Sequence, residues 1–313
     1  MELLCMEAPP QFGPAVPRAA FDSAIVGTDS VMAKLLALQA RYTVTCDYCK
    51  RVQTEVLSSM RKTVAMWMSE VCEDQGCEDS VFPTAMNLLD RYLSLTAVRK
   101  THLQLLGCVC LLLASKMRQT RALSVDALVY FTDDSVMHQE IQAWELQVLD
   151  KLGWDVACVV ANDFVDHLVA MVDLADCGDT VRRHANVFIS LCATEYNFVT
   201  YSPALLATSS VAAAVHGLSG PLHTTSAQDQ LLSSLERITN VRTTEIRRCV
   251  LEIETLMASS VAAFQQQALC KSITSVTPYT TSKSNALVPP PIVEPSSPSS
   301  QPNTPTDVQD INF

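Results

Sequence analysis

Residues 103–116 read LQLLGCVCLLLASK, and this stretch decides the fold. Its apolar residues fall on nearly every side of a helix, a pattern typical of a helix buried at the centre of a bundle. The longest apolar run, Leu105 to Ala114, has ten residues, whereas a helix needs about 20 to cross a bilayer. We therefore expect a central core helix over about 100–116.

Apolar residues spaced by three and four predict further helices around this one. The first stripe consists of Val52, Val56, Met60, Val64, Trp67 and Val71. The expected helices of this first unit are at about 50–73, 80–95, 100–116, 124–131 and 135–152. Together they form a five-helix unit.

A second run of five helices follows, and its third member is again small and apolar on nearly all sides. These helices are expected at about 161–173, 179–198, 202–217, 226–239 and 242–268. Asn162 is a candidate N-cap, and Pro203 suits the first position of a helix. Two five-helix units with the same internal pattern predict an all-α, duplicated fold.

Composition excludes several classes of function. The 313 residues are 48% hydrophobic, include only 8 glycines and carry a net charge of −11. Loops that bind phosphate groups need glycine where the backbone approaches the ligand, so the low glycine count argues against most nucleotide-binding folds. No Lys/Arg-rich run interrupts the acidic balance, which argues against nucleic acid and anionic membranes as partners.

The twelve cysteines are spread through apolar segments, and residues 1–10 lack a secretory leader. This pattern favours free thiols in a soluble, intracellular protein. Cys46, Cys49, Cys72 and Cys77 resemble a zinc ribbon only superficially, because the spacing within and between the pairs is wrong. We expect no metal, no cofactor and no catalytic residues. An all-α enzyme would need clustered polar residues, and none stand out.

The chain divides into four segments. Residues 1–29 carry four prolines and are expected to be a mobile arm. The two repeats are expected at 30–156 and 157–268. Residues 269–313 are rich in Ser, Thr and Pro and are expected to be disordered.

Several stretches resemble the cyclin family, and its D-type members most closely. They are MRKTVAMWM (60–68), EVCE (70–73), VFP (81–83), MN (86–87), LDRYLS (89–94), LQLLG (103–107), LASK (113–116), HA (184–185), LCAT (191–194) and TPTDV (304–308). The resemblance covers nearly the whole chain in order. It implies two tandem five-helix cyclin-box repeats with disordered tails.

The resemblance also implies a function. D-type cyclins are regulatory subunits, not enzymes, that bind and activate cyclin-dependent kinases four and six. The kinase then phosphorylates retinoblastoma-type proteins at the G1-to-S transition. The expected location is nucleus and cytoplasm. The alternative is a cyclin-box scaffold or transcription adaptor that does not activate a kinase.

By resemblance, Lys116, Glu145 and Trp154 are the kinase-binding residues. Lys116 ends the central helix, and Glu145 lies between Trp144 and Leu146. A charge in an apolar context is costly unless it is paired. We therefore expect Lys116 and Glu145 to lie together in space. The alternative interpretation is two unrelated surface charges.

The resemblance places a groove for Arg-x-Leu peptides of substrates on the helix over 50–73. Its expected residues are Met60, Arg61, Val64, Trp67, Glu70 and Gln104. From the residues alone, the apolar stripe is as compatible with core packing. Thr63 stands where relatives carry a larger apolar residue, so we expect weak docking.

Both tails carry short motifs. Leu3, Cys5 and Glu7 fit Leu-x-Cys-x-Glu, which retinoblastoma-type pocket proteins bind as an extended segment. Thr304 precedes Pro305 and is the expected phosphorylation site. By resemblance, its phosphorylation leads to a ubiquitin ligase and destruction. Kinase-inhibitor proteins are a further expected partner.

Overall fold

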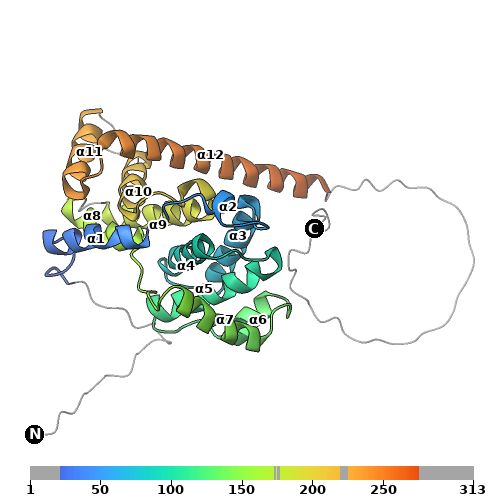
Figure 1. The fold of residues 1–313 in the computed structure, drawn as a ribbon. Coiled ribbons are helices and arrows are strands. Elements are labelled where there is room, and N and C mark those ends of the chain that lie inside the picture. The colour runs from blue at the N-terminus through green and yellow to red at the C-terminus, as the bar shows by residue number, and fades with distance from the viewer. Residues whose placement is uncertain (1–21, 173, 175–176, 219–224, 275–313) are drawn as a thin grey trace, which may run out of the picture. The chain divides into compact units, whose positions relative to one another are not determined.

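Helices are the only regular structure in the described residues of this computed structural model, 22–172, 174, 177–218 and 225–274 (Figure 1). This confirms the predicted all-α class. Within these ranges, no helix is both long enough and apolar enough to cross a membrane.

The first repeat surrounds α5 (Leu103–Arg118), in which every residue from Leu105 to Ser115 is buried. Helix α5 packs against its neighbours α3, α4 and α7. The repeat comprises α3 (Ser58–Asp74), α4 (Val81–Leu95), α5, α6 (Val125–Phe131) and α7 (His138–Lys151), with a 3₁₀ turn at Lys100–His102. The predicted central helix is confirmed.

The predicted helix over 50–73 is wrong in its first third. Helix α2 (Tyr48–Arg51) stops, and α3 starts only at Ser58. In between, the Gln53 amide nitrogen donates to the carbonyls of Leu93 (2.5 Å) and Thr96 (2.8 Å), and its oxygen accepts the Val98 N–H (3.0 Å). Val56 is fully buried in this irregular segment. The pattern therefore identified a core residue but not its backbone conformation.

The second repeat repeats the plan around α10 (Pro203–Gly217), whose residues are nearly all buried. Its helices are α8 (Asn162–Met171), α9 (Gly178–Thr194), α10, α11 (Thr225–Thr239) and α12 (Thr243–Thr274), with a 3₁₀ turn at Tyr196–Phe198. Pro203 occupies the first turn of α10 as predicted, after the N-cap Ser202. The predicted N-cap role of Asn162 is wrong, because Ala161 holds that position and the Asn162 amide donates to Asn186 Oδ1 (3.1 Å).

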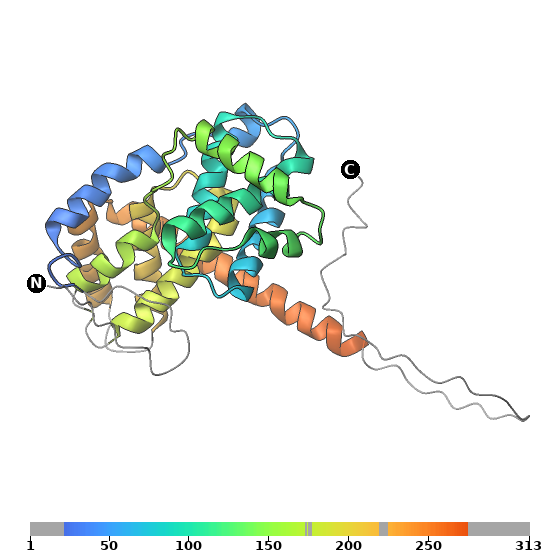
Figure 2. The ribbon, with the colours of Figure 1, turned by 90° about the horizontal axis from the view of Figure 1, so that it is seen from below.

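Helix α1 (Asp29–Tyr42) precedes the five bundled helices of the first repeat in sequence but packs on α8, α10 and α11 of the second (Figure 2). The turn before it is anchored at Gly27, whose N–H donates to Nδ1 of His167 (3.0 Å). Gly27 has a φ of +77°, and a Cβ there would lie 2.9 Å from the Ala170 side chain. Only glycine suits this close approach.

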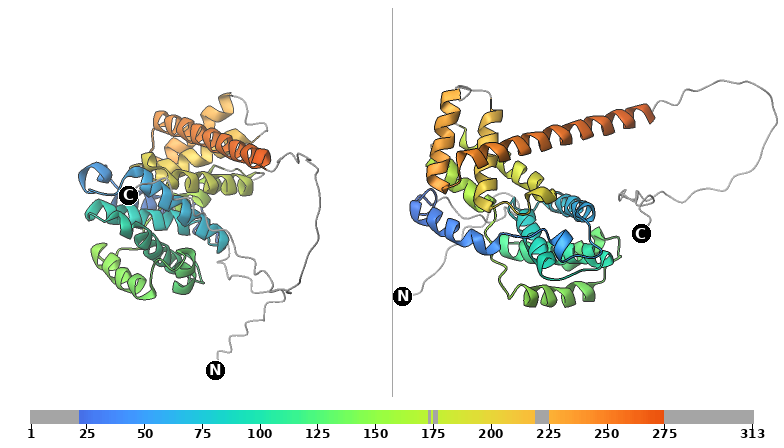
Figure 3. Two further views of the ribbon diagram at one scale, coloured as in Figure 1. Left: turned by 90° about the vertical axis from the view of Figure 1, so that its right-hand side faces the viewer. Right: turned by 45° about the horizontal axis from the view of Figure 1, so that its top comes forward.

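The two repeats lie side by side (Figure 3), and the arginine of a buried ion pair in the first repeat also bonds to the second. Arg61 of α3 donates to both carboxylate oxygens of Asp90 in α4 (3.1 and 2.7 Å), and the Tyr48 hydroxyl donates to the same carboxylate (2.7 Å). The remaining Arg61 nitrogen donates to the carbonyls of Ala193 and Thr194 at the end of α9 (2.8 Å each). One guanidinium thus links three helices across the junction.

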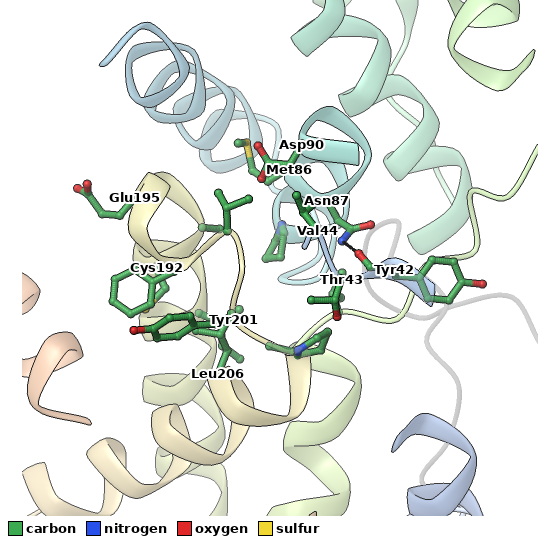
Figure 4. Close-up of a pocket in the computed structure, with 18 of the residues that line it drawn as sticks. Tyr42, Thr43, Val44, Met86, Asn87, Asp90, Cys192, Glu195, Tyr201 and Leu206 are labelled. Atoms are coloured by element: carbon green, nitrogen blue, oxygen red, sulfur yellow. Dashed lines mark hydrogen bonds between the residues drawn. The ribbon is translucent and has the colours of Figure 1, made fainter. Parts of the chain in front are cut away.

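Beside this network lies a small cavity of about 80 Å³. Figure 4 shows Asn87 and Tyr42 on one side of it and Cys192, Tyr201 and Leu206 on the other. The Asn87 amide donates to the Tyr42 carbonyl (2.8 Å), which fixes the end of α1 against α4. The cavity is too small for an ordinary organic ligand, since such pockets measure about 300–1,000 Å³.

Candidate functional site

Two charged residues from different helices meet at the surface of the first repeat. Lys116 lies in the last turn of α5, and Glu145 lies in the middle of α7. The Lys116 Nζ and Glu145 Oε1 atoms are 2.5 Å apart. The structure therefore brings together the two side chains that sequence reasoning paired, although 29 residues separate them.

The helices hold this pair rigidly, because α5 and α7 pack together through the core. The segment after α5 is fixed by Ser115, whose hydroxyl donates to the Leu112 carbonyl (2.8 Å) and accepts the Leu123 N–H (3.0 Å). The Lys116 side chain is 46% exposed and that of Glu145 is 19% exposed. Both groups can therefore form further hydrogen bonds, since an ammonium has three donors and a carboxylate about four acceptor sites.

Three large apolar side chains of α5, α7 and the turn after α7 face solvent. Leu146 is 62% exposed, Trp154 66% and Met117 46%. Trp154 also has a φ of +60°, and its N–H donates to the Leu149 carbonyl (2.8 Å). A bulky residue in the left-handed region is strained. This turn therefore holds an indole at the surface at an energetic cost, which points to an interaction surface.

The predicted docking residues of α3 form a half-buried strip. Met60, Val64 and Trp67 all pack on the core while keeping part of their surface exposed. Trp67 Nε1 donates to the Phe131 carbonyl (3.1 Å), which fixes the indole against the end of α6. Glu70 is exposed one turn further along α3. Both interpretations of the stripe, core and accessible face, therefore apply in part.

Gly107 allows α5 to approach this strip closely. A Cβ on Gly107 would lie 3.1 Å from the Val64 side chain, 3.2 Å from Met68 and 3.4 Å from Trp67. Gln104 is half-buried and lies one turn before Gly107, hence on the same face of α5. Thr63 is exposed, and its hydroxyl donates to the Ser59 carbonyl (3.2 Å).

Arg61 does not belong to this exposed strip. Its side chain is 1% exposed, and its nitrogens are engaged with Asp90 and the end of α9. The proposed contact of Arg61 with a docking peptide is therefore corrected to a structural role between the repeats. Sequence reasoning missed this because arginine is rarely buried unless it is paired, and Asp90 lies 29 residues away.

The predicted residues of the two tails lie outside the described residues: Leu3, Cys5, Glu7 and Thr304. In the described part of the chain, no cluster of three or more His, Cys, Asp or Glu residues could hold a metal ion.

The second repeat carries a related pair that sequence reasoning missed. His216 Nδ1 lies 2.6 Å from Glu254 Oε1, and these residues belong to α10 and α12. Lys116 and His216 hold the same position in their helices, 13 residues after Leu103 and Pro203 respectively. Because the helix registers match, comparing the two central helices could have found His216.

Comparisons with known proteins agree with this architecture. Residues 30–157 match the family described as "Cyclin, N-terminal domain", and residues 159–286 match "Cyclin, C-terminal domain". The solved structure of a viral cyclin from herpesvirus saimiri superposes with a TM-score of 0.62, 24% identity and coverage of 72% of this chain and 96% of that chain. This likeness supports the fold, two stacked helical repeats.

Curated relatives match over full length. The chain is 42% identical to G1/S-specific cyclin-D2 of Xenopus laevis and 41% identical to G1/S-specific cyclin-D3 of Homo sapiens, each over 100% of both chains. The chain therefore belongs to the cyclin family, in its D-type branch. It is a G1/S regulatory subunit of a cyclin-dependent kinase. The relatives and the two family matches favour this function over the alternative of a scaffold or transcription adaptor.

Proposed function

We propose that this chain binds and activates a cyclin-dependent kinase of the four/six type through the Lys116–Glu145 pair and the exposed Trp154. The observation that carries the proposal is the 2.5 Å pairing of Lys116, 46% exposed, with Glu145, 19% exposed, each followed directly in the chain by an exposed apolar residue, Met117 or Leu146. The pair presents a donor and an acceptor, which together suit the free backbone groups of a partner segment.

Activation follows from rigid presentation. The kinase carries a mobile regulatory helix that must rotate inward to place its own Lys–Glu pair on ATP. A partner shifts this equilibrium only by binding the inward state more tightly. Moving a population from 1:99 to 99:1 requires about 5.5 kcal/mol of differential affinity.

The exposed apolar residues can supply part of this energy. Fully burying a large apolar side chain contributes about 1.5–3 kcal/mol, and Met117, Leu146 and Trp154 are 46–66% exposed, so together they provide roughly 2–5 kcal/mol before the costs of association. The charged pair then fixes the orientation of the kinase helix. Charged groups at interfaces contribute specificity more than raw affinity.

The finer partners belong to the same proposal. Leu3, Cys5 and Glu7 bring a retinoblastoma-type protein to the complex, and the strip of Met60, Val64 and Trp67 with Glu70 and Gln104 holds its Arg-x-Leu segments. Kinase-inhibitor proteins are further partners of the complex. Phosphorylation of Thr304 adds about −1.5 to −2 charges and leads to recognition by a ubiquitin ligase. These events take place in nucleus and cytoplasm.

The test uses purified kinase without bound cyclin and a retinoblastoma-tail fragment as substrate. The full chain alone is expected to transfer no phosphate, and adding it is expected to switch the kinase on. Lys116→Glu is expected to abolish activation, while the matched variant His216→Glu in the second repeat leaves it unchanged. Binding without activation would instead support the scaffold alternative.

A further inference from the structure

Helix α3 ends in a backbone motif that brings two cysteines together. The Gly76 N–H donates to the Glu73 carbonyl (3.2 Å), and the Cys77 N–H donates to the Cys72 carbonyl (2.9 Å). Gly76 has a φ of +59°. These bonds and a left-handed glycine define a Schellman motif, in which the side chains three residues before the C-cap and two after it touch. Cys72 and Cys77 occupy these two positions.

The backbone hydrogen bond from the Cys77 N–H to the Cys72 carbonyl keeps the two cysteines next to each other at the helix end. The contact with Cys72 holds the pKa of the Cys77 thiol below its usual value, and Gln119 lowers this pKa further. Partial burial and the charge of Glu78 act in the opposite direction and raise it. The same contact, together with burial, raises the pKa of Cys72. Cys77 is half-buried, so small molecules can reach it, whereas Cys72 is buried beneath it.

We propose that Cys72 and Cys77 form a peroxide-reactive dithiol site, which takes a hydroperoxide as substrate and closes to a reversible disulfide. A disulfide needs Cα atoms about 4.4–6.8 Å apart. The backbone hydrogen bond between the same two residues holds their chains in direct contact. Closure therefore joins two residues that the end of α3 already holds next to each other. Disulfides of intracellular proteins are typically of this transient kind.

The reaction balances in two steps. The Cys77 thiolate attacks the terminal oxygen of the hydroperoxide; the O–O bond breaks, an S–O bond forms, and the leaving alkoxide takes up a proton to become an alcohol. The Cys72 thiol then attacks the Cys77 sulfur; the S–S bond forms, the S–O bond breaks, and the hydroxide leaves with the Cys72 proton as water. The two sulfurs lose two electrons, and the peroxide gains them.

None of the other described cysteines combines partial exposure with a backbone hydrogen bond to a second cysteine; Cys46 and Cys177 are half-buried but lack that bond. Cys108, Cys110, Cys158, Cys192 and Cys249 are buried. Burial raises the pKa of the Cys49 thiol. The alternative role for the pair is an apolar contact that only closes the helix end, since free cysteine behaves as a small hydrophobe. Reactivity toward peroxide separates the two roles.

The test is independent of kinase binding. The reduced full chain is treated with equimolar hydrogen peroxide, and peptide mapping follows each thiol over time. We expect Cys72–Cys77 to be the first disulfide formed, with an intact mass lower by about 2 Da. Cys77→Ser is expected to slow the first thiol loss at least about tenfold. Cys177→Ser, which removes another half-buried thiol, is the matched control and is expected to change nothing.

A second variant covers the possibility that Cys77→Ser disturbs the helix end. Cys72→Ser keeps the reactive thiol but removes its partner, so Cys77 sulfenic acid should accumulate and be trapped by dimedone. The proposal is overturned if Cys77 oxidises no faster than Cys177, if the first disulfide joins other residues, or if Cys72→Ser yields no trapped sulfenic acid.

Discussion

Replacing Arg61 by methionine tests the buried link between the repeats. Methionine keeps much of the volume but removes every donor, so Asp90 retains only the Tyr48 hydroxyl, and the carbonyls of Ala193 and Thr194 lose a partner. Removing one partner of a buried ion pair costs about 3–5 kcal/mol because the other charge stays buried. Two orphaned carbonyls add to this loss.

We therefore expect Arg61→Met to lower the free energy of unfolding by about 3–5 kcal/mol, out of a typical total of about 5–15 kcal/mol. Urea titration followed by far-UV circular dichroism measures it. Because Asp90 is the residue left unpaired, the double variant Arg61→Met/Asp90→Leu should recover part of the loss, with a coupling energy of about 1–3 kcal/mol.

The matched control is Arg182→Met on α9. Arg182 also pairs with two carboxylates, Asp166 and Asp179, but its side chain is 35% exposed. Exposed pairs contribute about 0–1 kcal/mol, so this variant should unfold at nearly the same urea concentration as the parent. If Arg61→Met cost no more than Arg182→Met, the buried link would not hold the repeats together.

Three further outcomes are expected. Gly107→Ala should push the Val64 side chain outward and weaken Arg-x-Leu peptide binding more than it weakens stability, as fluorescence titration and urea unfolding would show; equal peptide affinity would refute the role of Gly107. Burial holds the pKa of His167 below its ordinary value of 6.5, so at mildly acidic pH the unfolded chain binds more protons than the folded chain. The free energy of unfolding therefore has its full value above about pH 6.5 and falls as the pH drops toward the folded pKa, with a slope of at most about 1.4 kcal/mol per pH unit. His167→Gln should flatten that slope in urea titrations at pH 5–7.5, and an unchanged slope would contradict it. Thr304→Ala should lengthen the lifetime of the chain in a cycloheximide chase; unchanged turnover would count against the predicted phosphorylation site.

The central helices were predictable because a helix that is apolar on all sides is stable only where other helices bury it, at the centre of a bundle. Both α5 and α10 were identified on this basis, with ends within two or three residues of those observed. Helix α1 was missed because it buries only Met32 and Tyr42, too few positions for a clear periodicity. The start of α3 was misplaced because Val56 fits the three-and-four spacing of the apolar stripe and is buried, yet it lies in an irregular segment before the helix.

The candidate site divides in the same way. Periodicity placed Val64 and Trp67 on one face, but it could not separate core from accessible surface, and the structure shows that each is partly both. The pairing of Lys116 with Glu145 joins residues distant in sequence, so it came from the family resemblance and not from any local pattern. The role of Arg61 depends on Asp90 and on carbonyls of the other repeat, which only the folded chain brings together.

The most direct test of kinase binding is the charge-swapped variant Lys116→Glu/Glu145→Lys. The swap preserves an ion pair within the chain, and since Lys116 is nearly half exposed, stability should change by less than about 1 kcal/mol. However, the swap exchanges the positions of the positive and negative charges that the surface presents to the kinase. Calorimetric titration of the folded variant with the kinase should show affinity reduced by about 2–5 kcal/mol, and an affinity equal to that of the parent chain would contradict the account.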